Sequence, residues 1–232
     1  MAEMKTLGQL WSDSWDLFSS KFKSISILSL LLAIPIVIMY ILSPKEFLEP
    51  GLKFGVVNGW FILLFVALMI FTSLLLNIAV VYIASKNSKK SGISPILKYS
   101  LSKFWIAFFT SLAMTFMLLG LTLLLIIPGI IFLVYWAFTM PSLITKDLKF
   151  KKAMDYSKSV VKGRWWKALG YGIVFALIPI LVHIVTSVIL QTILPMNFAS
   201  AIMYIISSLI CSYMYVSQVV VFSEWDKHKI KN

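Results

Sequence analysis

Few side chains in this 232-residue sequence have the chemistry of a catalytic or metal site. The sequence holds one cysteine, Cys211, and two histidines, His183 and His228, that are far apart in the chain. A cysteine and a histidine can act as nucleophile and base, but no third group or oxyanion motif accompanies Cys211 and His183. A single cysteine also excludes an intrachain disulfide and a cysteine-rich zinc site. The sequence therefore predicts no catalytic residue, no metal ligand and no cofactor.

Three polar side chains of interest, including His183, lie within long apolar stretches. They are Asn77, His183 and Gln218. Such groups most often form hydrogen bonds between membrane helices. The alternative is that they line a water-filled path for a small solute. No carboxylate, lysine or arginine lies in these stretches, which argues against a proton-driven transporter because a coupled charge needs a partner there.

The composition shows which elements must hold these groups. Hydrophobic residues make up 60% of the chain and charged residues 13%, against about 45–50% and about 25% in soluble domains. A soluble domain of this length cannot bury so much apolar surface. The same composition excludes a disordered chain and a secreted disulfide scaffold. The sequence predicts an all-α integral membrane protein, with residues 1–232 forming a single membrane domain.

Four segments without a charged residue set the number of predicted spans. A transmembrane helix needs about 20 apolar residues. The first two segments fit one span each, whereas the last two are long enough for two. Each long segment contains a turn signal, Pro128–Gly129 in the third and Gln191–Asn197 in the fourth. The prediction is six transmembrane helices, with the third and fourth forming a tight hairpin. The four segments are Ser24–Pro44, Phe54–Ser85, Phe104–Thr145 and Ala168–Ser223.

The positive charges predict the orientation of these spans. Of the 21 lysines and arginines, 19 lie in one set of alternating segments outside the spans and two lie in the other set. The positive-inside rule then places both termini in the cytoplasm. We expect a multi-pass protein of the cell (cytoplasmic) membrane. The net charge of +12 follows mostly from this rule, so nucleic-acid binding is not expected.

Three segments outside the spans place apolar residues on one helical face. We expect each to form an amphipathic helix at the cytoplasmic interface, followed by two spans. One interpretation is a threefold repeat with units 4–85, 93–145 and 147–223. The alternative is that basic and aromatic residues flank any helix that enters a bilayer. The apolar faces are Leu7, Leu10, Trp11, Phe18 and Phe22; Ile93, Ile96, Leu97, Leu101 and Phe104; and Phe150, Ala153, Met154, Ser157 and Val161.

The third amphipathic segment carries the candidates for lipid contact. Its polar side is basic, and two tryptophans follow it. Anionic lipids attract lysines near the membrane surface, and indole rings favour the interface. We predict a helix that lies on the cytoplasmic leaflet against anionic lipid; the alternative is that the charges only set topology. The candidates are Lys151, Lys152, Lys158, Lys162, Arg164, Trp165 and Trp166.

Small residues recur every fourth position in the last two predicted spans. They are Ala168, Gly172 and Ala176 in one span and Ser208 and Ser212 in the other. Such spacing lets helix backbones approach closely. We interpret these residues as packing positions within the bundle, with a homodimer face as the lesser alternative. Replacing Gly172 by leucine is expected to destabilise the fold.

One stretch resembles a known membrane family. The residues Ile126–Phe132, then Met140–Pro141, then Ala153–Trp166 are similar to the bacterial and archaeal family named after the membrane domain of glycerophosphoryl diester phosphodiesterase. The shared pattern is an Ile-Pro-Gly hairpin, a later proline, and Ala…Ser…Val-x-Gly-x-x-Trp. The resemblance implies a six-helix membrane domain.

The same resemblance does not imply the enzyme. In the named members a separate barrel domain hydrolyses the substrate with histidines, carboxylates and a metal. A chain of 232 residues filled with membrane helices has no room for such a barrel. We therefore expect a non-enzymatic membrane protein, either a scaffold or a lipid-associated module. The alternatives are a passive small-solute transporter or channel and, less favoured, a membrane-embedded lipid enzyme.

Overall fold

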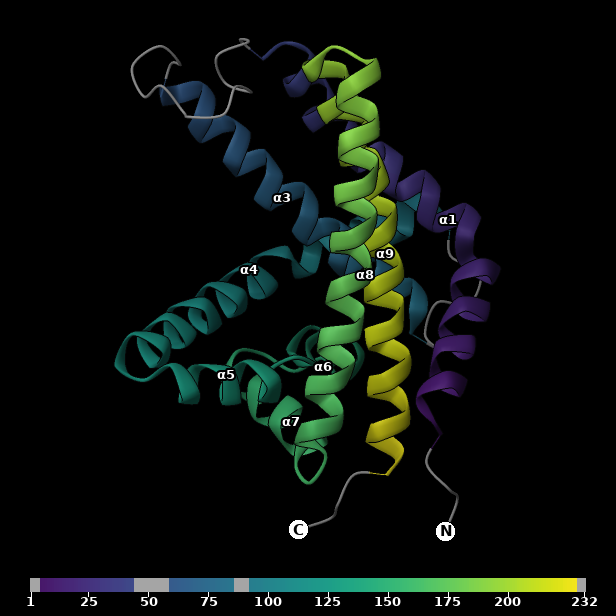
Figure 1. Ribbon diagram of the computed structural model, residues 1–232. Helices are drawn as coiled ribbons and strands as arrows, with labels where there is room; N and C mark the ends of the chain where they lie inside the picture. The colour runs from purple at the N-terminus through teal and green to yellow at the C-terminus, as the bar shows by residue number, and fades with distance from the viewer. Residues whose placement is uncertain (1–4, 44–58, 86–91, 229–232) are drawn as a thin grey trace.

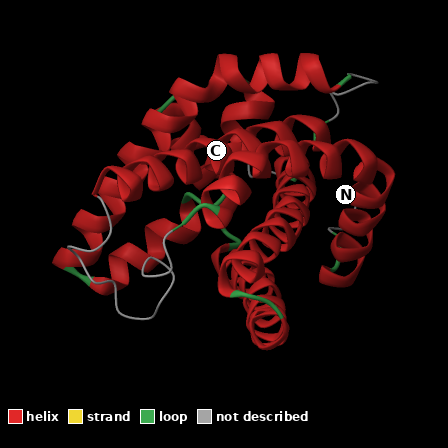
Figure 2. Ribbon diagram, turned by 90° about the horizontal axis from the view of Figure 1, so that it is seen from above, coloured by secondary structure: helices red, strands yellow, loops and turns green. Residues whose placement is uncertain are grey.

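The computed structural model describes residues 5–43, 59–85 and 92–228, and every regular element in these ranges is a helix. Figure 2 shows the described residues almost entirely as helix, with short loops between consecutive helices from α4 to α9. Six helical stretches are long and apolar enough to cross a membrane, with α5 and α6 counted as one stretch. The expected all-helical membrane architecture is thereby confirmed. The helices are α1 (Leu7–Ile41), α3 (Gly59–Ala84), α4 (Ile93–Leu124), α5 (Ile126–Tyr135), α6 (Thr139–Lys146), α7 (Lys151–Val161), α8 (Trp165–Ile193) and α9 (Met196–Lys227).

The centre of the fold is the pairing of α1 with α9, which is the most extensive helix contact in the described chain. The beginning of α1 and the end of α9 lie at the same end of the bundle in Figure 1, and we call it the termini end. The hydroxyls of Ser29 and Ser212 meet across this pair at 3.0 Å, and both side chains are buried. Small hydroxyl residues allow close approach of two helices and a hydrogen bond between them.

Two of the three amphipathic segments are not separate helices. Residues 7–22 continue into the first span within α1, and residues 93–104 continue into α4. A capping box starts α1. In it, Thr6 Oγ1 accepts a hydrogen bond from the backbone N–H of Gln9, with a donor–acceptor distance of 3.4 Å. Beyond that cap, no helix-breaking residue separates the amphipathic segment from the span, so the helix continues.

The third amphipathic segment forms a helix of its own, α7. The backbone breaks before and after it at residues with positive φ, Asp147 (52°) and Phe150 (44°) on one side and Gly163 (79°) on the other. Phe150 precedes the helix and is exposed, so it does not belong to the apolar face as predicted. The other four residues of that face are buried.

The predicted hairpin between the third and fourth spans is present, but its turn is displaced. The chain turns at Leu125, where φ is −156° and ψ is 123°, three residues before Pro128. Pro128 instead lies in the first turn of α5, where a missing N–H leaves no hydrogen bond unmade. Figure 1 shows the α4–α5 hairpin projecting sideways from α8 and α9. The second predicted turn is in place, because α8 ends at Ile193 and α9 begins at Met196.

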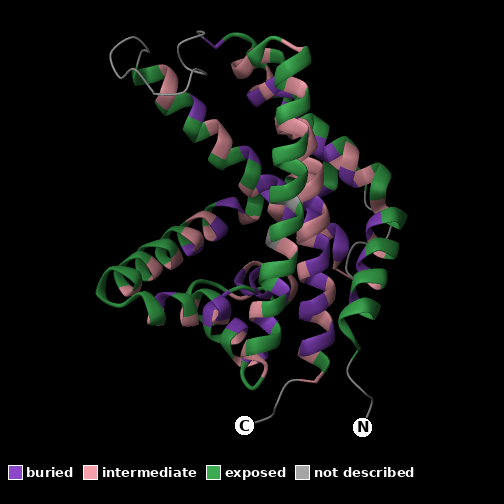
Figure 3. Ribbon diagram, viewed as in Figure 1, coloured by how far each residue is buried: buried purple, intermediate pink, exposed green. Residues whose placement is uncertain are grey.

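Large apolar side chains cover the outside of the molecule. Figure 3 shows exposed residues along the α4–α5 hairpin and along α8. Leu123 at the hairpin tip is 87% exposed, and Ile127 is 72% exposed. Contiguous apolar surface of this extent is avoided by soluble monomers, whereas lipid tails solvate it.

Some sequence predictions concern residues outside the described ranges. The units 4–85, 93–145 and 147–223 remain a prediction, since residues 44–58 and 86–91 are not described. The side chain of Ala176 is likewise outside the described set. The same applies to seven lysines that enter the charge distribution, namely Lys45, Lys53, Lys86, Lys89, Lys90, Lys229 and Lys231.

Candidate functional site

A cavity of about 470 Å³ with polar groups in a mainly apolar lining lies between α3 and α4. Its floor comes from the break between α5 and α6 and from α9. We call it the α3–α4 cleft. It is not enclosed. Its polar lining residues are Ser73, Asn77, Thr110, Ser111, Thr115, Thr139, Tyr215 and Gln218.

Helical periodicity brings the lining of α3 onto one face. Ile70, Ser73, Leu74 and Asn77 follow the spacing of one helical stripe. Asn77 lies seven residues before the end of α3, about 10 Å along the axis. Gln218 lies nine residues before the end of α9, about 14 Å along the axis. Both amides line the α3–α4 cleft.

The cleft offers hydrogen-bonding groups but no charge. No residue that lines it is charged. The hydroxyls of Thr110 and Thr139 donate to backbone carbonyls of their own segments, at 2.6 and 2.7 Å. Their oxygens therefore remain available as acceptors toward the cleft.

The Asn77 amide leaves part of its hydrogen-bonding capacity unused. Asn77 Oδ1 is buried without a partner among the described residues, although the Asn77 side chain is a hydrogen-bond neighbour of the Tyr215 hydroxyl. A buried amide oxygen without a partner is unusual in native structures. Such a group, beside hydroxyl acceptors in an apolar cleft, suits a ligand that both donates and accepts hydrogen bonds and carries no charge.

His183 does not line the cleft that contains Asn77 and Gln218. His183 lies on α8 and lines a separate hollow of about 290 Å³ together with Ser207 and Cys211. Its Nδ1 is 3.3 Å from Ser207 Oγ on α9, the interhelical hydrogen bond expected of a lone membrane histidine. No cluster of three or more His, Cys, Asp or Glu side chains occurs within the described residues.

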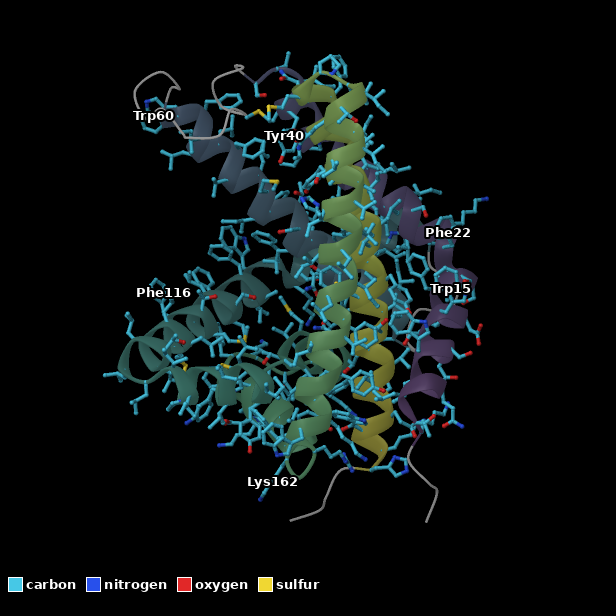
Figure 4. All side chains as sticks on the ribbon, in the orientation of Figure 1. Trp15, Phe22, Tyr40, Trp60, Phe116 and Lys162 are labelled. Atoms are coloured by element: carbon cyan, nitrogen blue, oxygen red, sulfur yellow. The ribbon has the colours of Figure 1, made fainter. Side chains whose placement is uncertain are left out.

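The basic surface of α7 lies near the termini end. Lys151, Lys152, Lys158 and Lys162 are exposed, and Lys162 projects from this end in Figure 4. The opposite face of α7 is buried: Ala153, Val160 and Val161 are each 0% exposed. That face packs against α5, α6 and α9. The apolar stripe therefore contacts protein and is not available for insertion into a leaflet, which corrects the predicted role of the stripe.

Two of the predicted lipid-contact residues have structural roles. Arg164 donates to the carbonyl of Trp225 at 3.1 Å and also to the carbonyl of His228. The guanidinium thus satisfies carbonyls at the end of α9, and burial lowers its pKa. The Trp165 indole donates to the Ile131 carbonyl at 3.3 Å. Trp166, by contrast, is 78% exposed.

The small-residue stripe of α8 is only partly a packing face. Ala168 is buried, but Gly172 is exposed and a Cβ built there would meet nothing within 4 Å. The close approach of helices predicted at Gly172 is therefore wrong. On α9, Ser212 is buried against α1 as described above, and its hydroxyl donates to the Ser208 carbonyl at 2.8 Å.

Sequence reasoning missed most of the cleft. Thr110, Ser111 and Thr115 form a small polar group in an otherwise apolar span, which was a usable signal. Nothing in the sequence connects that group with Asn77 or Gln218, since the pairing of α3, α4 and α9 is a tertiary property.

The comparisons with known proteins assign no relative to this chain. No family model matches it, no curated protein matches it, and no solved structure matches it.

Proposed function

We propose that this chain is a lipid-associated membrane protein that holds the uncharged polar part of a membrane lipid in the α3–α4 cleft. The observation that carries the proposal is the meeting of two amides, Asn77 and Gln218, in a cleft without a charged lining residue. The ligand class is a lipid with hydroxyl or ester groups, such as a diacylglycerol. The protein would act by binding and presenting the lipid, without catalysing its conversion.

The parts of α3 and α4 that extend beyond the cleft support entry of a ligand from the bilayer. Figure 4 places Trp60 on α3 and Phe116 on α4, on the two arms that flank this side of the molecule. Both side chains are exposed, at 78% and 66%. A ligand that arrives between these arms would come from the hydrocarbon, where lipid tails can lie along apolar helix faces. The amides then reach the glycerol end of the lipid.

A photocrosslinking experiment tests the proposal. The full chain is reconstituted in phosphatidylcholine vesicles that contain a diazirine-labelled diacylglycerol, and crosslinked peptides are mapped by mass spectrometry. Crosslinks are expected on the cleft faces of α3 and α4. Replacing Asn77 and Gln218 together by leucine should lower the yield about fivefold, the effect of one or two net hydrogen bonds.

The matched control is Gln191→Leu, which removes an exposed amide at the far end of α8. It should leave the yield unchanged. Equal crosslinking in all variants, spread evenly over the exposed apolar surface, would show that the cleft does not select a lipid.

A passive path for a small neutral solute is the second candidate function. Its support is the polar lining of the cleft, which could be hydrated. It predicts glycerol-induced swelling of vesicles that is reduced by Asn77→Leu, with no concentration of lipid crosslinks in the cleft. His183 lines a separate hollow and does not contribute to this path.

Two further points belong to the proposal. We propose that the protein lies in the cell membrane with both termini in the cytoplasm, and that the basic face of α7 faces anionic lipid. We also propose the family resemblance in residues 126–166. A hairpin between α4 and α5 agrees with it, but the turn lies at Leu125 and not at Pro128–Gly129. Cysteines placed one at a time in a Cys211→Ser background test the topology, because Lys158→Cys should resist a membrane-impermeant label applied from outside.

A further inference from the structure

A second pocket, distinct from the cleft, lies where the first turns of α1 and α8 meet the end of α9. Its volume is about 370 Å³. Figure 1 shows these three helix ends at the termini end. We call it the α1–α8 pocket. It is lined by Lys5, Thr6, Leu7, Leu10, Trp166, Lys167, Gly170, Tyr171 and Trp225.

A residue that lines this pocket carries an unsatisfied hydroxyl. Tyr171 is 7% exposed, and its hydroxyl has no hydrogen-bond partner among the described residues. Tyr171 follows Lys167 by four positions on α8, so both residues lie on the helix face that lines the pocket. A buried tyrosine hydroxyl normally has a partner. A ligand in the pocket would supply one.

The surroundings of the pocket favour an anion. Lys5 and Lys167 contribute two positive charges, and Lys167 forms no ion pair with a described residue. The N-terminal ends of α1 and α8 carry partial positive charge, and no side chain caps the first turn of α8. The backbone N–H groups of a first turn bind phosphate oxygens well.

Two carboxylates lie near the α1–α8 pocket, and their negative charge bears on whether an anion can bind there. Asp13 pairs with Lys5 at 2.5 Å, and the three donors of an ammonium group can serve Asp13 and a ligand together. Glu224 also interacts with Lys5 but is buried and pairs with Lys227 at 3.0 Å. Neither carboxylate lines the pocket.

The rest of the pocket suits the apolar part of an interfacial lipid. Leu7 is 61% exposed and Trp166 is 78% exposed. Exposed tryptophan at the end of a membrane helix is typical of the headgroup region. A soluble anion would gain nothing from these side chains, whereas the glycerol and upper chain of a phospholipid would contact them.

We propose that the α1–α8 pocket binds the phosphodiester of an anionic phospholipid, with Lys167 and the Tyr171 hydroxyl as its principal contacts. The inference rests on the membrane placement in the proposed function but not on the cleft. It names a specific site, in contrast to a diffuse attraction between lipid and the lysines of α7.

Binding of phosphatidylglycerol to the purified full chain in neutral detergent micelles tests the proposal. Lys167→Gln should weaken the apparent affinity about tenfold, as expected for the loss of a charged hydrogen-bonding partner. Tyr171→Phe should weaken it about threefold, as expected for one hydroxyl. Lys167→Arg keeps the charge and should restore binding, and thermal unfolding shows that each variant is folded.

Two matched controls separate binding in this pocket from a diffuse attraction between lipid and basic side chains. Lys151→Gln removes the same charge from the exposed face of α7, and Tyr213→Phe removes a hydroxyl that does not line the pocket. Both should change the affinity less than about twofold, below the effect of one hydrogen bond. Equal losses for Lys151→Gln and Lys167→Gln would overturn the proposal in favour of diffuse attraction.

Two more probes identify the source of the phosphodiester. Soluble glycerophosphoglycerol has the headgroup without the chains, and diacylglycerol has the chains without the phosphate. Neither should compete with phosphatidylglycerol at this pocket. Competition by the soluble headgroup would overturn the assignment to a lipid. Because the Asn77→Leu and Gln218→Leu variants affect only the cleft, failure of either site can be recognised separately.

Discussion

Gly129 of α5 faces Thr122 of α4 with no space for a Cβ, and its replacement by alanine tests how the α4–α5 hairpin is closed. A Cβ at this position would lie 2.3 Å from Thr122 Oγ1 and 3.1 Å from Thr122 Cα. The hydroxyl cannot turn away without losing its hydrogen bond to the Leu118 carbonyl, which is 2.8 Å long. The backbone atom can move only if α4 and α5 separate. Gly129→Ala is therefore expected to push the two helices apart.

Overpacking of this kind costs about 1–3 kcal/mol. For a chain of this length, that corresponds to a fall in melting temperature of about 2–10 °C. The measurement is thermal unfolding of the purified protein in a fixed detergent, followed by tryptophan fluorescence. Thr122→Ala removes the oxygen of the closest contact, so the double variant with Gly129→Ala should recover part of the loss.

The control is Gly120→Ala on the same hairpin. A Cβ at Gly120 meets nothing within 4 Å, and alanine favours a helix over glycine by about 1 kcal/mol. This variant should be as stable as the wild type or more stable. Equal stability of Gly129→Ala and Gly120→Ala would refute the reasoning, because it would mean that Thr122 and Gly129 are not in contact.

Three other predictions follow from contacts at the termini end and on α8. The hydrogen bond and charge of Lys103 lower the pKa of Asp147. The stabilisation from this pair is present above the ordinary pKa of about 3.9 and is lost as the pH falls through the lowered value. Asp147→Asn should remove that part of the acid dependence in a pH series of unfolding curves, and an unchanged series would contradict this prediction. Because the pair is exposed, it stabilises the fold by at most about 1 kcal/mol. Arg164→Gln should destabilise the end of α9 by about 1.5–3 kcal/mol, the range for hydrogen bonds to a charged group, with faster hydrogen exchange there than in the middle of α9. Gly172→Leu should unfold within about 0.5 kcal/mol of the wild type, as surface changes do, and so should Val188→Leu; a large loss for Gly172→Leu alone would restore the packing role that the spacing of small residues predicts for that glycine.

The membrane class and the number of apolar helices were predictable because they depend on local properties. A run of about 20 residues without charge must form a helix in lipid, whatever its neighbours are, since its backbone groups have no other partners there. The turn at 191–197 was predictable because a charge-free segment too long for one span must contain a turn, and the polar residues and proline there mark its position. Pro128–Gly129 misled the prediction because proline suits the first turn of a helix as well as a loop.

Only the tertiary structure shows which face of each helix packs against other helices and which face is exposed. The apolar stripe of α7 has the same sequence pattern whether it faces lipid or protein, and only the packing of α5, α6 and α9 shows that it faces protein. Ala168 and Gly172 share one spacing pattern, yet one is buried and the other is exposed. Asn77 and Gln218 meet in one cleft while His183 does not. These relations depend on the rotation of each helix about its axis, which is fixed by side-chain packing between residues far apart in the sequence.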